Sequence, residues 1–188
     1  MVDVRDVASL CAAVEGGATP SYLMFWGHTA KEGQAVGPWV LSQWWYAPFI
    51  VEGDTFATAE HWMMAGKARL FGDAQRRREI LEAADPKTAK ALGRKVQGFD
   101  DRTWNEHRFE LVIAGNLAKF AQHDELRDYL LSTGERVIVE ASPHDRIWGI
   151  GMRASASKAT DPRLWLGRNL LGFALMEVRA RLADPDRV

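Results

Sequence analysis

The stretch "FATAEHWMMAGKARLFGD" (Phe56–Asp73) organises the predicted fold, because it combines the apolar spacing of a helix with a cap residue. Thr58 is a favoured N-cap residue, and the helix is expected to begin directly after it. Glu60 and Lys67 lie seven residues apart, close to two helical turns, so both share the face that carries Met64. A carboxylate and an amine on an apolar face make this helix the first candidate for a functional site.

The segments before this helix favour β-strands. Tyr22–Thr29 and Pro38–Trp45 are rich in β-forming residues. "PFIVEGDTFA" predicts two strands joined by a turn at Glu52-Gly53-Asp54, and Arg136–Ser142 predicts a later strand. These segments predict a small, mostly antiparallel sheet.

Most of the remaining chain is predicted to be helical, with one long loop. Helices are expected in residues 4–15, 73–84, 86–96, 101–120, 124–134 and 170–182, with Asp85 and Asp100 or Asp101 as caps. The loop "PHDRIWGIGMRASASKATDPRLWLGRN" (Pro143–Asn169) is unusually long for a compact domain, and such loops are often functional. We therefore predict one mainly helical α+β domain over residues 21–184, with residues 1–20 as a helical extension.

Composition excludes several classes of protein. Lys and Arg number 24 against 25 Asp and Glu, so no broad basic surface for non-specific nucleic-acid binding is expected. The single cysteine, Cys11, allows no internal disulfide and fits a reducing cytoplasm. The acidic, interrupted N-terminus does not match a signal peptide, and no apolar run is long enough for a membrane span. The eight tryptophans offer flat faces for stacking, although a Trp-rich core explains most of them equally well.

Three features are candidates for chemistry, and each has a structural alternative. Glu60, in the first helical turn, suits a base, a nucleophile or a cation stabiliser, or is an ordinary surface carboxylate. Lys67 becomes a nucleophile if its amine is buried, or simply extends along the surface to solvent. The loop "HDRIWGIGM" contains Asp145, Trp148 and two glycines that allow close backbone approach to a ligand, or is a turn around a buried Trp.

Other common sites are not indicated by the sequence. The five histidines lack metal-ligand spacing, and "EHWMMAGK" lacks the second histidine of the zinc motif HExxH. There is no GxSxG nucleophile motif and no phosphate-binding P-loop. No metal and no cofactor are therefore expected.

Taken together, these segments resemble one family, the NADAR or YbiA-like domain. The resemblance rests on "EHWMMAGK", "DRIWGIG" and "WLGRNLLG" with their surroundings, in the order of the family and over about residues 22–181. The family pattern usually has Ser-Asn where this chain has Ser42-Gln43, and glutamine keeps the amide group but is one methylene longer. The combination is much more specific than any single motif.

The resemblance implies N-glycosidase chemistry. Some members hydrolyse ribosylamino-pyrimidine phosphates, which are intermediates of riboflavin synthesis, and others remove ADP-ribose from the amino group of guanine. Both substrates join ribose C1′ to an exocyclic amine of a base. By this resemblance the chain is expected to be a cytoplasmic hydrolase acting on ADP-ribosylated guanine in DNA, RNA or a nucleotide, with an ADP-ribosyltransferase as counterpart. Clearance of riboflavin intermediates is the alternative, and a binding module that recognises ADP-ribose without cleaving it is an alternative of another class.

The resemblance also assigns roles by matched position. Glu60, Lys67 and Asp145 are the expected catalytic residues: Glu60 to stabilise a cation or move protons, Lys67 to attack C1′, and Asp145 to hold ribose hydroxyls or assist proton transfer. The expected substrate-binding residues, for base stacking, ribose and phosphate contacts, are Trp44, Arg94, Trp104, Trp148, Gly149, Gly151, Arg168 and Asn169. The site is expected between the Glu60–Lys67 helix, the Asp145–Gly151 loop and the Trp165–Asn169 segment.

Overall fold

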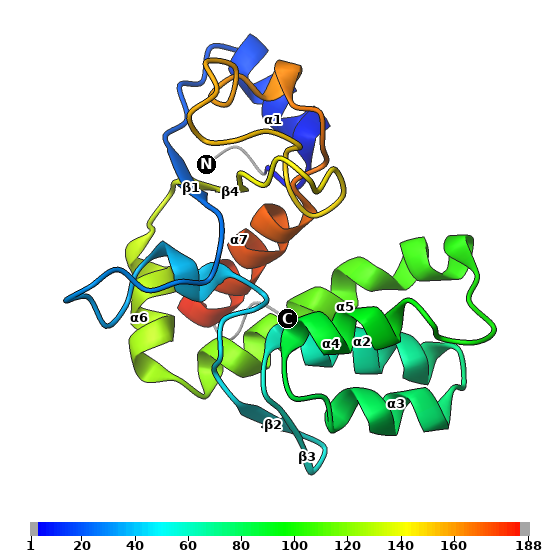
Figure 1. Cartoon of the computed structure of the whole chain (residues 1–188). Helices are drawn as coiled ribbons and strands as arrows, with labels where there is room; N and C mark the ends of the chain where they lie inside the picture. Colours follow the sequence, from blue (N-terminus) through cyan, green and yellow to red (C-terminus); the bar gives the residue numbers. More distant parts are fainter. Residues whose placement is uncertain (1–3, 185–188) are drawn as a thin grey trace. The chain divides into compact units, whose positions relative to one another are not determined.

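The computed structural model describes residues 4–184 and contains two compact units (Figure 1). One unit takes in the described residues up to Ser42 and those from Glu125 onward. The other is the continuous stretch Gln43–Asp124. The chain therefore leaves the first unit after Ser42, builds the second unit, and returns at Glu125. Mainly helical α+β architecture is confirmed in both units.

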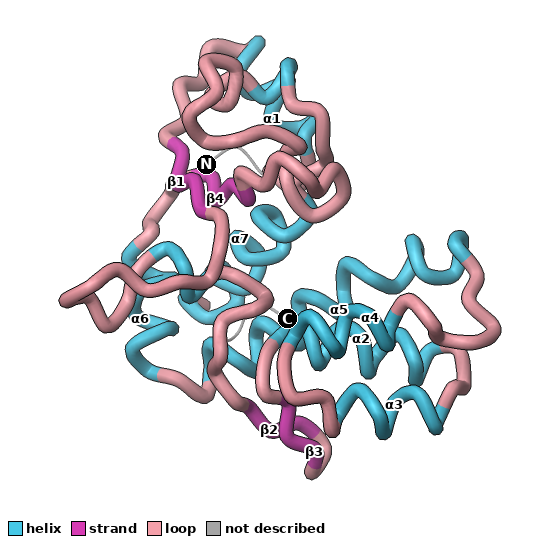
Figure 2. Tube along the Cα trace, viewed as in Figure 1, coloured by secondary structure: helices cyan, strands magenta, loops and turns pink. Residues whose placement is uncertain are grey.

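The first unit is built on a parallel pair of strands. β1 (Tyr22–Phe25) pairs with β4 (Val137–Glu140), and the two lie side by side in Figure 2. α7 (Leu170–Ala183) packs against β4. The prediction of one mostly antiparallel sheet is wrong in this respect, since residues 4–184 contain two separate two-stranded sheets and the longer one is parallel. Parallel strands need a long crossover, and here the crossover contains the entire second unit.

The helix predicted near the N-terminus is confirmed as α1 (Val7–Glu15). Asp6 caps it through a capping box with Ser9, and Gly17, at φ 93°, leads the chain away from its end. α1 packs against the short 3-10 helix Pro162–Leu164 of the same unit. Residues 1–3 of the predicted extension lie outside the described residues, and the domain boundary near residue 20 stays a prediction.

The strand predicted at Pro38–Trp45 is wrong, because Pro38–Leu41 forms a 3-10 helix. Proline fits the first position of a helix, where no backbone N–H is needed. The chain also closes tightly here: a Cβ on Gly37 would lie 2.4 Å from the ring of Trp39. β-propensity reflects packing on a sheet, and none of the strands within residues 4–184 pairs with this segment. α6 (Asp124–Ser132) then leads toward β4 as predicted.

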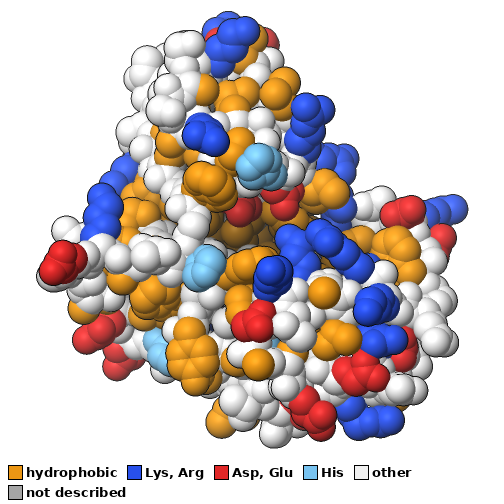
Figure 3. Space-filling model, in the orientation of Figure 1, with side chains coloured by type: hydrophobic (Ala, Val, Ile, Leu, Met, Phe, Trp, Pro, Cys, Tyr) orange, Lys and Arg blue, Asp and Glu red, His pale blue; other side chains and the backbone are white. Residues whose placement is uncertain are grey.

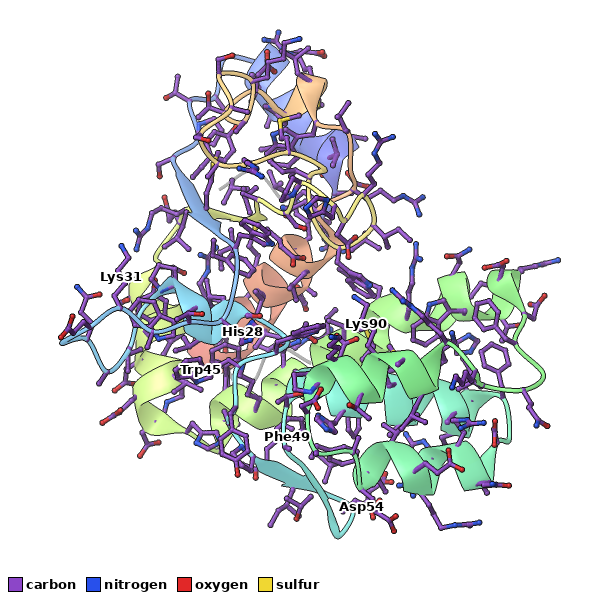
Figure 4. The ribbon with its side chains drawn as sticks, viewed as in Figure 1. His28, Lys31, Trp45, Phe49, Asp54 and Lys90 are labelled. Atoms are coloured by element: carbon purple, nitrogen blue, oxygen red, sulfur yellow. The ribbon has the colours of Figure 1, made fainter. Side chains whose placement is uncertain are left out.

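The second unit begins with the predicted hairpin. β2 (Phe49–Val51) pairs antiparallel with β3 (Asp54–Phe56), and Figure 4 labels Phe49 at the open end and Asp54 at the turn. The two turn residues between them, Glu52 and Gly53, have φ of 52° and 85°. Two consecutive positive φ values match the tight hairpin turn whose twist suits antiparallel strands.

Four helices complete the second unit: α2 (Ala59–Leu70), α3 (Ala74–Leu81), α4 (Pro86–Gly93) and α5 (Asp101–Ala121). The predicted caps Thr58, Asp85 and Asp100 are confirmed, since each side chain accepts a backbone N–H of the first turn. α2 packs against α3, α4 and α5, and is therefore the central element of this unit. The candidate residues Glu60 and Lys67 are carried on this central helix.

Trp62 joins α2 to α5 and to the hairpin. Its ring centroid lies 5.0 Å from that of Phe56, and its Nε1 donates to Leu111 O at 2.7 Å. Gly115 of α5 faces the same indole, and a Cβ on Gly115 would lie 2.1 Å from Cδ1 of Trp62. Because Gly115 has no side chain, α2 and α5 can approach each other closely enough for Trp62 to fit between them.

Gly115→Ala is expected to destabilise the protein by about 1–3 kcal/mol, the usual cost of overpacking a core. In an unconstrained helix the same change would stabilise the protein by roughly 1 kcal/mol, so the sign of the change in the free energy of unfolding distinguishes the two cases. Urea unfolding measures this change. The neighbouring exposed Ala114→Gly change serves as the control for helix propensity. A Gly115→Ala protein more stable than wild type would contradict this packing.

Candidate functional site

Glu60 occupies the second position of α2 and is buried, with 2% of its surface exposed. Its backbone N–H donates to Gln43 O at 2.9 Å, which ties the first turn of the helix to the start of the second unit. The amides of a first helical turn are complementary to a negative charge. The alternative that Glu60 is an exposed surface carboxylate is therefore wrong.

Lys67 lies two turns later and is half-buried among aromatic rings. Its Nζ lies 3.9 Å from the ring centroid of Phe99 and 5.7 Å from that of Trp104. Burial lowers the pKa of the Lys67 amine below its usual 10.5, and the charge of Asp101 opposes that shift in part. The ring faces attract the ammonium form as well. The amine is thus held in a fixed place and carries a larger neutral fraction than an exposed lysine.

The remaining site residues predicted in the second unit lie on and around α4. Trp44 is half-buried, and Nζ of Lys90, labelled on α4 in Figure 4, lies 5.8 Å from its ring centroid. Met64, between Glu60 and Lys67 on α2, packs so closely against α4 that a Cβ on Gly93 would lie 2.1 Å from its sulfur. Arg94 caps the end of α4 and is exposed. Stacking faces and cations therefore accompany the carboxylate and the amine within one unit.

In the first unit, Asp145 folds its own loop into a tight turn. Its Oδ1 accepts the backbone N–H of Ile147 at 2.8 Å and of Trp148 at 2.7 Å. Its backbone oxygen accepts the N–H of Gly151 at 3.0 Å. Its Oδ2 makes no hydrogen bond to any residue from 4 to 184. One carboxylate oxygen therefore shapes the loop, and the other is available for a ligand.

The Asp145–Gly151 loop and the Trp165–Asn169 segment lie against each other, as predicted. Five backbone N–H groups, from the Trp165–Asn169 segment and the first turn of α7, donate to the carbonyl oxygens of residues 146–150. The pairs are Leu166 to Ile150, Arg168 to Arg146, Asn169 to Gly149, Leu170 to Ile147 and Leu171 to Trp148. Gly149 and Gly167 permit this approach: a Cβ on Gly167 would lie 2.2 Å from Gly149 O. The predicted convergence of these two segments with α2, which belongs to the other unit, stays a prediction.

Asn169 and Arg168, which were predicted to make phosphate or polar contacts with the substrate, have different environments. Asn169 is fully buried; its Oδ1 accepts the N–H of Glu140 at 2.9 Å and its Nδ2 donates to Ile138 O at 2.9 Å. Its amide is therefore occupied in holding β4, which favours a supporting role for this residue. Arg168 is exposed, and its guanidinium remains a candidate for phosphate.

Sequence reasoning missed two features of the second unit. Lys119 of α5 is fully buried, and burial lowers the pKa of its amine to about 7. Gln43 and Asn116 form a buried pair, with Gln43 Nε2 donating to Asn116 Oδ1 at 3.0 Å. Helical spacing could have indicated the burial of Asn116 and Lys119, because residues 112, 116 and 119 lie on the same face of α5. No local pattern indicates a partner for Gln43.

His61 has a structural role. It is 1% exposed, its Nε2 lies 3.1 Å from Ala83 O, and its Nδ1 lies 2.8 Å from Thr58 Oγ1. Since a carbonyl oxygen only accepts, Nε2 carries the hydrogen and Nδ1 accepts from the Thr58 hydroxyl. Burial lowers the pKa of His61 below its usual 6.5.

This pKa shift predicts a pH dependence of stability. Below the unfolded pKa of about 6.5 the unfolded chain takes up a proton more readily than the folded chain, so the free energy of unfolding should fall as the pH drops through that value. Urea unfolding between pH 5 and 8 should show a smaller fall for His61→Gln than for wild type. His107→Gln, which removes an exposed histidine, is the control. An unchanged pH profile for His61→Gln would contradict the assignment.

The described residues contain neither a helix long and apolar enough to cross a bilayer nor a group of three or more His, Cys, Asp or Glu side chains placed to hold a metal ion. In Figure 3, basic and acidic side chains are interspersed over the visible face.

Comparison with known proteins identifies relatives along most of the chain. The model of the NADAR domain matches residues 24–183. The chain is 42% identical to N-glycosidase R617 of Acanthamoeba polyphaga mimivirus over 166 residues, which are 86% of this chain and 96% of that protein. It is 34% identical to N-glycosidase YbiA of Escherichia coli strain K12 over 136 residues, 72% of this chain and 76% of that protein.

A solved structure shares the fold. The NMR structure of the E. coli protein YbiA superposes with a TM-score of 0.69 at 28% sequence identity, and the match covers 90% of this chain and 89% of that one.

Proposed function

The chain belongs to the NADAR domain family, and from that premise we propose that it is an N-glycosidase that cleaves the bond between ribose C1′ and an exocyclic amine of a base, with ADP-ribosylated guanine as its substrate. The names of two relatives, R617 and YbiA, support an N-glycosidase, that is, a hydrolase of N-glycosyl bonds. The observation that carries the finer proposal is the buried carboxylate of Glu60 and the partly desolvated amine of Lys67 on one face of α2.

The bond itself explains why both groups are useful. Ribose C1′ bonded to an amine nitrogen and to the ring oxygen O4′ is an N,O-acetal. Protonation of O4′ breaks the C1′–O4′ bond, and loss of the nitrogen proton leaves an imine between C1′ and the base nitrogen. An exocyclic amine is a poor leaving group until this opening occurs. A carboxylate and a neutral amine at the same bond can move the proton and attack the imine carbon.

We assign the attack to Lys67. Its neutral amine adds to C1′, a proton passes to the base nitrogen, and the base leaves with its amine intact. Water then hydrolyses the Schiff base between Lys67 and C1′, which returns the free lysine and the sugar aldehyde, and the aldehyde closes to ribose. The lowered pKa of Lys67 supports this assignment, because only the neutral amine is nucleophilic.

Glu60 is assigned the proton transfers between O4′, the base nitrogen and water. The carboxylate is buried, and burial excludes the solvent that would otherwise compete for these protons. The first turn of α2 holds it in place through the Glu60 N–H bond to Gln43. Trp44 and Trp104 supply flat faces for a bicyclic base, and the cations Lys90 and Arg94 suit a diphosphate.

Two substrates offered in parallel test the proposal. The protein is incubated with an oligonucleotide carrying ADP-ribosylated guanine and with a ribosylamino-pyrimidine phosphate, and the released sugar is identified by mass spectrometry. Release of ADP-ribose from the oligonucleotide supports the proposal. Release of ribose phosphate alone favours clearance of riboflavin intermediates, and binding of ADP-ribose without turnover of either substrate favours a binding module.

Borohydride distinguishes the lysines. Reduction during turnover should leave a sugar adduct on the peptide that contains Lys67. An adduct on Lys119 instead would contradict the assignment of Lys67, since the buried amine of Lys119 also has a strongly lowered pKa. No adduct on any lysine during wild-type turnover would favour a direct route through a cationic sugar.

A further inference from the structure

Gln43 and Asn116 form a buried pair of amides, 73 residues apart in the sequence, that the assigned chemistry does not use. Gln43 is 8% exposed and Asn116 is fully buried. Gln43 Nε2 donates to Asn116 Oδ1 at 3.0 Å, and Asn116 Nδ2 donates to Val112 O at 2.8 Å. The pair therefore links the start of the second unit to α5.

The hydrogen-bond pattern fixes which way both amides point. The carbonyl of Val112 can only accept, so the group of Asn116 that faces it is the NH₂. The Oδ1 of Asn116 must then face Gln43, and only the NH₂ of Gln43 can donate to it. The remaining atom of Gln43, Oε1, is consequently an acceptor.

That acceptor has no donor within the described protein. Gln43 Oε1 is a buried atom, and none of the residues from 4 to 184 donates a hydrogen bond to it. Leaving a buried polar atom unsatisfied costs about 1–3 kcal/mol, and such atoms in native proteins are uncommon enough to require an explanation. The pairing with Asn116 accounts for Nε2 of Gln43, but it leaves Oε1 of the same amide without a partner among residues 4–184.

The position of Gln43 relates the unsatisfied oxygen to the candidate site. The backbone oxygen of Gln43 accepts the N–H of Glu60, so the two residues are in direct contact at the first turn of α2. The next residue, Trp44, is a candidate for stacking on the base, with the Lys90 amine over its ring. The unsatisfied acceptor therefore belongs to a residue that borders both the proposed acid–base group and a candidate stacking ring.

We propose that Gln43 Oε1 accepts a hydrogen bond from a ring N–H of the substrate's base and so selects bases that carry a lactam N–H. The inference rests on the proposed function, because both candidate substrates carry such a group. The selection arises because a base without this donor would leave the buried Oε1 unpaired, and an unpaired buried oxygen costs free energy. Sites built in this way discriminate strongly against analogues that lack the donor.

The glutamine is also the point at which this chain departs from the usual Ser-Asn of the family pattern. Its side chain is one methylene longer than asparagine, which moves the amide farther from the backbone. In this conformation Nε2 donates to Asn116 Oδ1 at 3.0 Å. Gln43→Asn should therefore loosen the amide pair and weaken the selection without abolishing it.

Binding of unreactive ligands tests the inference independently of turnover. Guanosine and 1-methylguanosine, which lacks the ring N–H, are titrated into wild type and Gln43→Met by calorimetry. Wild type should bind guanosine about 10- to 100-fold more tightly than 1-methylguanosine, as expected for loss of one buried hydrogen bond. Gln43→Met should bind the two ligands within about threefold of each other. Gln122→Met, which removes a glutamine bonded to the backbone of Ile50, is the matched control and should retain the preference.

Three outcomes overturn the inference. These are equal discrimination by wild type and Gln43→Met, no preference in wild type, and no binding of guanosine by wild type. The experiments distinguish a failure of the proposed function from a failure of the role assigned to Gln43. Turnover of ADP-ribosylated guanine by a wild type that shows no preference refutes only the role of Gln43, whereas preference without turnover refutes only the proposed reaction.

Discussion

Glu60→Gln is expected to lower kcat/KM for cleavage of ADP-ribosylated guanine by about 10²- to 10⁴-fold, the usual contribution of a positioned acid–base group. The substitution keeps the size and the hydrogen-bonding outline of the side chain but removes its capacity to carry a proton between O4′, the base nitrogen and water. The loss should appear mainly in kcat, because the transfers occur after the substrate has bound. Steady-state kinetics with the oligonucleotide substrate measure the change.

Glu106→Gln provides the control for Glu60. Glu106 lies in the same unit, on α5, and its exposed carboxylate pairs with Arg102. An exposed pair of this kind is worth about 0–1 kcal/mol, so this variant should retain wild-type activity. If Glu60→Gln kept activity within threefold of wild type, Glu60 would have no role in proton transfer.

Lys67→Met is expected to reduce kcat by at least about 10²-fold, in the range seen when a positioned acid–base group is lost. It should also remove the adduct trapped by borohydride. Methionine retains the apolar stem that packs near Phe99 and Trp104, so the aromatic surroundings should persist. The wild-type rate should rise with pH through the lowered pKa of Lys67, because only the neutral amine attacks, and this limb of the profile should be missing in the variant.

Lys67→Arg separates nucleophilic attack from simple charge. Arginine keeps a cation over the rings of Phe99 and Trp104 but remains protonated and forms no Schiff base. This variant should therefore be as inactive as Lys67→Met. Substantial activity in Lys67→Arg would show that the positive charge, rather than the amine, is what the reaction needs.

Local rules predicted a large share of the fold. Thr58, Asp85 and Asp100 were expected as caps and are observed as caps, because capping depends on the few residues that follow. The hairpin turn at Glu52 and Gly53 was likewise expected from a local signal. The family resemblance, carried by short motifs, is confirmed by the match over residues 24–183.

Non-local contacts could not be predicted in the same way. β1 pairs with a strand that follows the whole second unit, and nothing in Tyr22–Phe25 indicates a parallel partner. Pro38–Leu41 has the composition of a strand, but it forms a 3-10 helix and pairs with no strand among residues 4–184. The chain's passage through two compact units also required the folded structure.

The candidate site was predictable by residue but not by environment. Glu60 and Lys67 were found from their spacing on one face, yet the burial of Glu60 and the rings around Lys67 depend on elements distant in sequence. Asn169 was predicted to make phosphate or polar contacts with the substrate, which stays a prediction, and its amide bonds to β4 in an arrangement set by residues about 30 positions away. The environments of these side chains depend on packing between elements that are distant in the sequence, and a pattern within one helix or loop cannot predict that packing.

The identity of the released base tests the central claim most directly. After incubation with ADP-ribosylated guanine, the base product is analysed by mass spectrometry. Cleavage between C1′ and the nitrogen predicts unmodified guanine that retains its exocyclic amine, together with an equal amount of free ADP-ribose, and neither product with Glu60→Gln over the same time. A base that carries oxygen in place of the amine, or an intact substrate after prolonged incubation with the wild-type protein, would contradict the proposed reaction.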